Sequence, residues 1–220
     1  MSHLTRALRT LRGARALACG PGIACVLLLM AWGCAHAGGG PLGIDYELKY
    51  DNAGIWKRSY QMDLQDAAIG TMGIGALWLG NDNALGHAFW QDIDAEAISA
   101  LAAQGLKYAF GRARPAAGDN PNMWFHSGQS FPSGEVTLQA AFVTPIIVDY
   151  IKQDPWIATL EVLPLYDAIG RMKVHAHWQT DVIGGWLLGM GVGYWTSRLK
   201  VPLVVRILPG GLSVGIATRF

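Results

Sequence analysis

Apolar stretches of intermediate length recur along this chain, and they constrain its fold more than any other feature. They run for about 14 to 17 residues, are rich in Ala, Leu, Ile and Gly, and are separated by clusters of turn-forming residues. A helix that spans a bilayer needs roughly 20 apolar residues. Most of the stretches also carry charge, as at Asp66, Asp149 and Lys152. We therefore expect an all-α fold, a water-soluble helical bundle rather than a bundle of membrane spans.

The turn residues that bound the apolar stretches set the expected helix limits. We predict helices at residues 63–79, 92–111, 133–151, 156–169 and 178–199. Pro145 is expected to kink the third helix, and the glycines of the last helix are expected to allow close helix contact. Residues 38–52 are expected to be irregular, and the alternation after Val201 predicts a small C-terminal β-hairpin.

The first 37 residues are typical of a secretory signal peptide. Four arginines and no acid precede an apolar stretch, and Ala35-His36-Ala37 is a small-x-small cleavage pattern. We therefore expect residues 1–37 to be removed, residues 38–220 to form a single domain, and the protein to be periplasmic. Two alternatives stay open: an uncleaved anchor in an integral membrane protein, and lipidation at Cys34.

Removal of this segment changes the charge and the cysteine content. Four of the 17 basic residues and none of the 16 acidic residues precede Gly38, so the remainder has 13 basic and 16 acidic residues and a net charge of −3. The three cysteines, at positions 19, 25 and 34, are also lost. The domain would then have no disulfide, so its stability must come from packing. The charge balance indicates no nucleic-acid partner, and the oligomeric state stays open.

Three short blocks carry the residues suited to chemistry, and the first contains Lys107 and Arg114. The two cations are seven residues apart, which is two helical turns, so we expect both to project from one face of a helix end. A lysine and an arginine together can hold a tetrahedral anion. The structural alternative is a solvated basic face that ends at Pro115.

The second block, Phe131-Pro132-Ser133-Gly134-Glu135, lies where a helix is expected to start. The Ser133 hydroxyl and the Gly134 amide would point out from a helix N-terminus, which attracts anions. A plain helix cap at Ser133 explains the same residues.

The third block contains Arg171, His177 and Asp181. The histidine and the aspartate are four residues apart at a helix start, so their side chains can meet. A carboxylate bonded to one imidazole nitrogen fixes the tautomer and leaves the other nitrogen as a nucleophile. Arg171 can supply a third cation, although an isolated surface His–Asp pair stays possible.

Together the blocks resemble the type 2 phosphatidic acid phosphatase superfamily, whose pattern is K-x6-R-P, then P-S-G-H, then S-R-x5-H-x3-D. The resemblance covers about residues 98–195. It implies a helical bundle of the phosphatidic acid phosphatase and haloperoxidase type, and an exported phosphatase of phosphomonoesters or pyrophosphates. Lipid phosphates are weakly favoured by the apolar, Trp-rich chain.

The resemblance also implies a role for each matching residue. His177 attacks phosphorus to give a phosphohistidine, Asp181 orients it, and water completes the hydrolysis. The implied phosphate-binding residues are Lys107, Arg114, Ser133, Gly134 and Arg171. No metal and no cofactor is implied. The expected partner is a phosphorylated small molecule or lipid, with membrane-surface association left open.

The chain departs from the pattern at Glu135, which replaces the histidine that protonates the leaving group in the family. A glutamate among cations is expected to be ionised and unable to donate a proton, whereas burial near Asp181 favours the protonated acid. Glu135 is thus a candidate catalytic residue in doubt, with His126 and His175 as alternative donors. A phosphate- or lipid-binding pseudoenzyme is therefore an alternative function. A vanadium haloperoxidase is disfavoured by the short chain. The second departure, Gly170 in place of the family serine, is minor.

Overall fold

The structure is a computed structural model that describes residues 38–118 and 120–204. These residues all belong to one compact unit within Gly33–Phe220. The predicted signal peptide and most of the predicted β-hairpin lie outside the described residues. At the start of that hairpin, Leu203 and Val204 are helical, and their N–H groups donate to Asp94.

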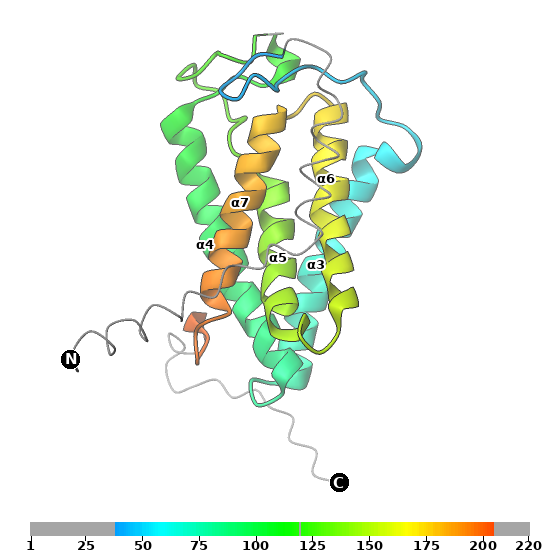
Figure 1. Ribbon diagram of the computed structural model, residues 1–220, viewed down its shortest axis with the longest axis vertical. Coiled ribbons are helices and arrows are strands. Elements are labelled where there is room, and N and C mark those ends of the chain that lie inside the picture. The colour runs from blue at the N-terminus through cyan, green and yellow to red at the C-terminus, as the bar shows by residue number, and fades with distance from the viewer. Residues whose placement is uncertain (1–37, 119, 205–220) are drawn as a thin grey trace, which may run out of the picture. The chain divides into compact units, whose positions relative to one another are not determined.

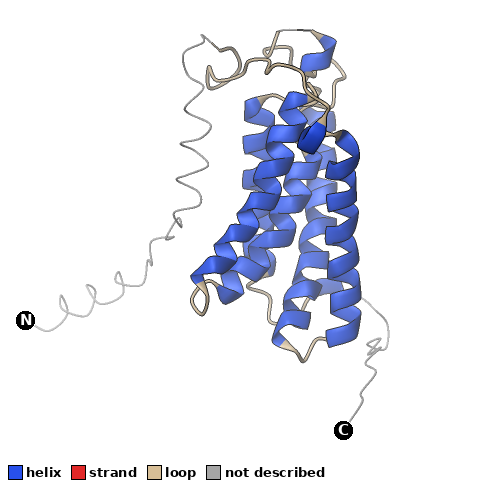
Figure 2. Ribbon diagram, turned by 90° about the vertical axis from the view of Figure 1, so that its right-hand side faces the viewer, coloured by secondary structure: helices blue, strands red, loops and turns tan. Residues whose placement is uncertain are grey.

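The described residues form α-helices joined by loops and short 3-10 turns, with no strand among them (Figure 2). The α-helices are α3 (Arg58–Leu79), α4 (Ala84–Phe110), α5 (Gly134–Tyr150), α6 (Val162–Lys173) and α7 (Gln179–Thr196), and the 3-10 turns are η2 (Gly54–Trp56), η3 (Pro115–Ala117) and η4 (Pro155–Glu161). The all-α prediction is confirmed for this part of the chain.

Helix α5 is the centre of the bundle, because it packs against α3, α4, α6 and α7 (Figure 1). The apolar core lies where α3, α4 and α5 meet, and includes Met72, Phe89, Phe142 and Ile146. The helices run alternately up and down in Figure 1. As a result, the end of α4, the starts of α5 and α7, and the end of α6 all lie at the upper end of the bundle.

Local capping explains why several helix limits differ from those predicted. Helix α4 begins at Ala84 rather than residue 92, because the Asn83 side chain accepts hydrogen bonds from the first-turn N–H groups of Leu85 and Gly86. It ends at Phe110, because Gly111 adopts a left-handed conformation with φ 48°. The predicted helix at 156–169 is divided between η4 and α6.

Glycines let α7 lie close to α5, as expected from the sequence. A Cβ added to Gly185 would lie 2.5 Å from Ser133 O, and one added to Gly193 would lie 2.8 Å from Thr144 Cβ. Gly191 does not share this role, since a Cβ there would meet nothing within 4 Å. The close approach matters because it brings the start of α7 against the start of α5.

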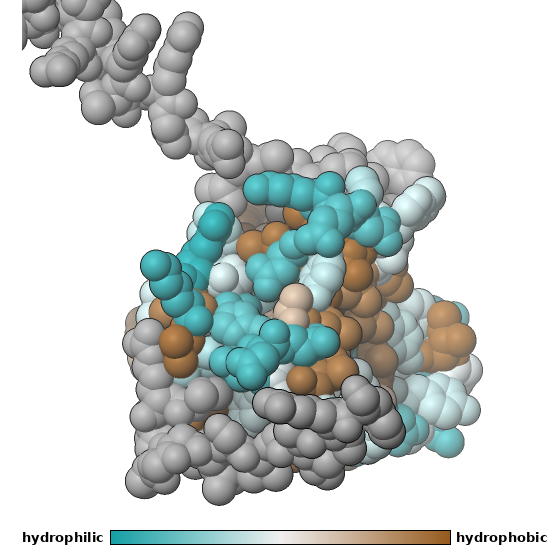
Figure 3. Space-filling model, turned by 90° about the horizontal axis from the view of Figure 1, so that it is seen from below, coloured by the Kyte–Doolittle hydropathy of each residue, from teal (hydrophilic) through white to brown (hydrophobic). Residues whose placement is uncertain are grey.

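The outer surface of the bundle is partly apolar. Ile74, Leu77 and Trp78 of α3 are exposed, and beside them lies a shallow apolar groove that Phe89 of α4 completes. The lower end of the bundle carries hydrophilic and hydrophobic side chains side by side (Figure 3). No helix in the described ranges combines the length and the hydropathy needed to cross a bilayer.

Candidate active site

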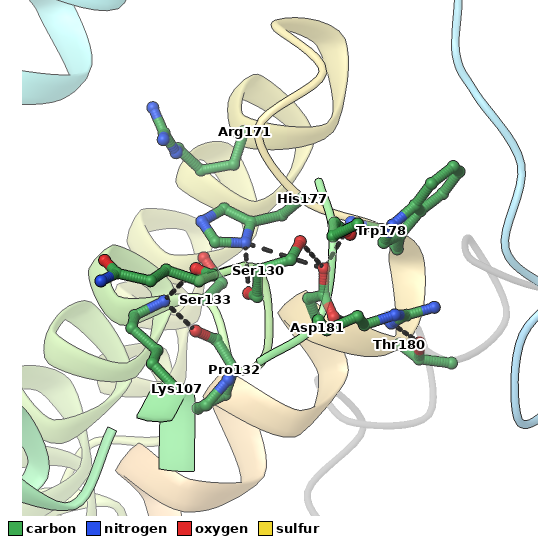
Figure 4. Close-up of polar contacts among 12 residues, drawn as sticks. Lys107, Ser130, Pro132, Ser133, Arg171, His177, Trp178, Thr180 and Asp181 are labelled. Carbon is green, nitrogen blue, oxygen red and sulfur yellow. Dashed lines mark hydrogen bonds and ion pairs between the residues drawn. The ribbon is translucent and has the colours of Figure 1, made fainter. Parts of the chain in front are cut away.

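His177 occupies the centre of the site at the upper end of the bundle (Figure 4). It lies just before α7 and is 4% exposed. Its Nδ1 is 2.7 Å from the backbone carbonyl oxygen of Ser130. A carbonyl only accepts, so Nδ1 carries the proton and Nε2 is left with a free lone pair. Burial, reinforced by the charges of Lys107 and Arg171, lowers the pKa of His177 to about 4 against the opposing charge of Asp181.

Asp181 lies beside this ring without a hydrogen bond to it, since its Oδ2 is 3.8 Å from His177 Nδ1. The Ser130 hydroxyl donates to Oδ2 at 2.5 Å and the Trp178 N–H at 2.8 Å. Burial acts to raise the pKa of Asp181, but His177, Arg112 and Ser130 together hold it below its usual value. The hydrogen bond expected between His177 and Asp181 is therefore not formed, and the Ser130 carbonyl orients the neutral imidazole instead.

Arg112 fixes Asp181 from the other side, and the sequence reading missed it. Its guanidinium is fully buried and lies 2.6 Å from Asp181 Oδ1 and 2.6 Å from Asp45 Oδ2. It also donates to the Pro121 carbonyl and stacks at 4.4 Å from the Trp124 ring. Arg112 lies within the first sequence block, but the sequence did not predict the turn at Gly111 that directs its side chain inward.

Lys107 and Ser133 supply donors next to His177. The Lys107 Nζ donates to the carbonyls of Gln129 at 2.9 Å and Pro132 at 2.6 Å, which leaves one of its three N–H groups. Burial, helped by the charge of Arg114, lowers the pKa of Lys107 to about 8. The Ser133 hydroxyl is buried and has no hydrogen-bond partner among the described residues. It does not cap α5, so the plain-cap explanation fails.

Gly134 is the first residue of α5. A Cβ there would make only an ordinary contact, 3.6 Å from Lys107 Cε. Packing within the protein therefore does not require glycine at this position. The small residue keeps the α5 N-terminus, with its free N–H groups, open toward the donors described above.

Arg171 and Arg114 complete the set of cations, but in different settings. Arg171 is buried at the end of α6, and its Nε forms no hydrogen bond within the described part of the chain. Arg114 is exposed, and its charge helps to lower the pKa of Lys107. The expectation that Lys107 and Arg114 share one helix face is wrong, because α4 ends four residues before Arg114. The loop nevertheless returns Arg114 to the neighbourhood of Lys107.

Glu135 lies in the first turn of α5 and forms a two-armed ion pair with Arg58 of α3. The Arg58 NH1 and NH2 groups each lie 2.6 Å from one of its carboxylate oxygens. Arg171 Nε is 3.6 Å from Oε2. Glu135 thus joins two arginines, and Arg58 is a second residue that the sequence reading missed.

The two alternative proton donors lie away from these groups. His126 is exposed in the loop after Trp124. The His175 Nε2 lies 2.7 Å from the Leu48 carbonyl, and its ring packs edge-on against Tyr50. No three His, Cys, Asp or Glu side chains gather as possible metal ligands in the described ranges.

Comparison with known proteins assigns the family. The model of the PAP2 superfamily matches residues 94–203, which is half of the chain. The lipid A 1-phosphatase of Porphyromonas gingivalis is 31% identical over 97 residues, which are 42% of this chain and 20% of that protein. The chain therefore matches only a fifth of this relative's length. No solved structure matches. The matched range contains all three blocks, and the chain belongs to the PAP2 superfamily.

Proposed function

We propose that the protein is a phosphatase that works through a phosphohistidine at His177. The observation that carries this proposal is the buried imidazole whose Nδ1–H is held by a carbonyl, which leaves Nε2 unprotonated. The pKa of about 4 keeps the ring neutral at ordinary pH. A neutral, oriented imidazole beside several cations is suited to attack on a phosphate.

In the first step, His177 Nε2 forms a bond to phosphorus while the bond from phosphorus to the leaving oxygen breaks. Lys107, Arg114 and Arg171 hold the phosphoryl oxygens, with the Ser133 hydroxyl and the α5 N-terminus as further donors. The imidazole becomes positively charged, and the Asp181 carboxylate 3.8 Å away stabilises that charge. In the second step, water attacks phosphorus, the N–P bond breaks, and the water proton leaves with the solvent or the phosphate.

We favour lipid phosphates as the substrates, and the predicted signal peptide supports an exported location. The relative named above is a lipid A 1-phosphatase, and apolar side chains of α3 are exposed. A protein with such a surface can approach lipid aggregates from the water phase. We therefore propose a periplasmic enzyme that acts on lipid phosphates at a membrane surface.

The test is phosphate release from lipid and soluble phosphate esters by the wild type, His177→Ala and His126→Ala. His126 is the matched control because it is an exposed histidine outside the site. We expect His177→Ala to lose at least about a thousandfold in kcat, and His126→Ala to keep the wild-type rate. Normal turnover by His177→Ala would overturn the proposal.

A second candidate function is phosphate binding without turnover, and the ion pair of Glu135 favours it. A carboxylate held by two arginines occupies the position of the family's proton donor. A binding protein would take up vanadate or phosphate but release no phosphate from any ester between acid and mildly alkaline pH. Robust hydrolysis of any ester in that panel would exclude it.

A further inference from the structure

A layer of largely buried polar side chains lies between α3, α5 and α6, which pack against one another beside the proposed active site (Figure 1). Each helix contributes two residues that are four apart and so share one face: Gln61 and Gln65, Glu135 and Gln139, Asp167 and Arg171. Gly170 lets α6 approach α3, because a Cβ there would lie 2.5 Å from Gln61 Nε2. Gln139 Nε2 donates to Gln65 Oε1 at 3.3 Å. The polar groups of the site therefore continue into the bundle.

Asp167 is a member of this layer that has no partner. Its side chain is 2% exposed, and neither of its carboxyl oxygens has a hydrogen bond to any residue that the structure describes. Arg171 lies one turn further along α6, but its Nε is 3.6 Å from a carboxylate oxygen of Glu135 and makes no ion pair with Asp167. A buried carboxylate without a donor is costly, so the carboxyl of Asp167 keeps its proton.

Three charged groups face Asp167: Glu135 of α5, Arg171 of α6 and Arg58 of α3. Burial, helped by the charge of Glu135, raises the pKa of Asp167 to about 7 against the opposing charges of the two arginines. The carboxyl therefore holds its proton at a pH below that value and loses it as the pH rises through it. A proton that is held near neutral pH and can be given up there is what general-acid catalysis requires.

Glu135 lies between Asp167 and the groups that would bind the phosphate. It follows Ser133 and Gly134 directly, in the first turn of α5. Its two oxygens accept hydrogen bonds from Arg58 at 2.6 Å, and the side chain is 27% exposed. A carboxylate has about four acceptor sites, so two of them remain. Neighbouring carboxyl groups can share one proton, and Glu135 can therefore take a proton from Asp167 and pass it to a bound ligand.

We infer that Asp167 supplies the proton for the leaving oxygen and that Glu135 relays it. The inference rests on the proposed function, because His177 Nε2 must form its bond to phosphorus. As the P–O bond breaks, its electron pair stays on the leaving oxygen. One proton moves from Asp167 to Glu135, and one from Glu135 to that oxygen. The leaving group departs as an alcohol, and the Asp167 carboxylate regains a proton from the solvent through Glu135.

The test compares two phosphomonoesters that differ in their need for a proton. They are an alkyl ester and a nitrophenyl ester with the same hydrocarbon chain, presented in the same detergent micelles. An alkoxide is about as basic as hydroxide, whose conjugate acid has a pKa of about 15.7. A phenol has a pKa of about 10, and a nitro group lowers it further. We expect Asp167→Asn to lose at least about a hundredfold in kcat/KM for the alkyl ester and less than about threefold for the nitrophenyl ester.

Asp92→Asn is the matched control. Asp92 of α4 is also buried, and its two carboxyl oxygens are likewise without partners in the described ranges. It lies about 22 Å along the helix from Lys107, so Asp92→Asn should keep the wild-type kcat/KM for both esters. Glu135→Gln removes the carboxylate that relays the proton, and it should show the same selective loss as Asp167→Asn.

The wild type provides a measurement that needs no variant. Because Asp167 loses its proton as the pH rises through about 7, kcat/KM for the alkyl ester should fall near that value. The nitrophenyl ester should keep its rate until Lys107 loses its charge near pH 8. Alkaline limbs at the same pH for both esters would contradict the relay.

The outcomes distinguish this inference from the proposed function. Equal losses for both esters in Asp167→Asn would indicate a structural role and overturn the inference, as would an unchanged rate for the alkyl ester. Wild-type hydrolysis of the nitrophenyl ester alone would also overturn it, and each of these results keeps the phosphatase. Hydrolysis of neither ester, or hydrolysis that survives His177→Ala, would overturn the proposed function itself.

Discussion

At the scale of single residues, a backbone carbonyl holds the imidazole of His177, the proposed nucleophile, with Nδ1 protonated and Nε2 unprotonated. The Ser130 carbonyl accepts from His177 Nδ1, while the Ser130 hydroxyl donates to Asp181. One residue thereby fixes both members of the pair. Asp181 is left to act through its charge, which grows in importance as the imidazole becomes positive.

The pH dependence of kcat/KM follows from two of these groups. His177, with a pKa lowered to about 4, loses its nucleophilic lone pair as the pH falls through that value. Lys107, with a pKa lowered to about 8, loses its charge as the pH rises through that value. For a nitrophenyl ester we expect a bell-shaped profile with limbs near those two values, once the ionisation of the substrate has been divided out. Lys107→Arg should displace the alkaline limb upward, and an unmoved limb would contradict the role given to Lys107.

Two arginines separated by one residue should respond to substitution in opposite ways. Arg112→Gln would leave Asp45 and Asp181 as buried carboxylates without their cation, and should lower the free energy of unfolding by about 3–5 kcal/mol. Arg114→Gln removes an exposed side chain, and should change that free energy by less than about 0.5 kcal/mol.

Measured activity should also distinguish these two variants, because Arg114→Gln should lose activity without losing stability. Arg114→Gln should lose about tenfold or more in kcat/KM while remaining folded, because it removes a phosphate donor. Urea unfolding followed by fluorescence measures the stabilities, and phosphate release measures the activities. Equal loss of stability in both variants would contradict a structural role for Arg112 and a phosphate-binding role for Arg114.

The sequence predicted several of the side chains that form the site, but not the groups that hydrogen-bond to them or pair with them. Spacing brought Lys107, Arg171 and His177 together, because each stands in a block tied to a helix end. Asp45 and Ser130 were not predicted because their contacts depend on the tertiary fold. Every residue has a backbone carbonyl, so the residue type at position 130 cannot indicate a hydrogen bond to that group. The pairing of Glu135 with Arg58 spans 77 residues, so local spacing could not predict it.

At the scale of helices, the apolar stretches predicted which segments are helical, and capping decided where they begin and end. The limits of α5 and α7 lie within a few residues of those predicted. At the start of α7 the Asp181 carboxylate accepts from the Trp178 N–H, whereas the Ser133 side chain makes no capping hydrogen bond at α5. Helix α4 was predicted too short. The turn at Asn83 was read only as the end of one helix, although the same side chain caps the next.

The contact between α5 and α7 gives a matched pair of glycine substitutions. A Cβ at Gly189 would overlap the Thr137 carbonyl oxygen, whereas one at Gly191 would meet nothing within 4 Å. Gly189→Ala should therefore cost at least about 1–3 kcal/mol of stability by overpacking. Gly191→Ala should be neutral or stabilise the fold by up to about 1 kcal/mol, because alanine favours helix. Equal effects of the two variants in urea unfolding would contradict the close packing of these helices.

At the scale of the whole molecule, the up-and-down order of the helices explains how distant segments form one site. The end of α4, the starts of α5 and α7, and the end of α6 share one end of the bundle (Figure 1). The segment at residues 39–45, expected to be an irregular lead-in, closes this end by placing Asp45 against Arg112. The apolar stretches of the sequence could predict the bundle, but not that this N-terminal segment contributes to its site.

The central claim is that His177 takes the phosphoryl group, and trapping that group tests it most directly. The enzyme should be mixed with a substrate labelled in its terminal phosphate, quenched in alkali within the first turnovers, and digested for mass spectrometry. We predict labelled phosphate on His177, lost when unlabelled substrate is added as a chase and absent in His177→Ala. Two results would contradict the account. One is a label on a residue other than His177 during wild-type turnover, and the other is undiminished turnover by His177→Ala.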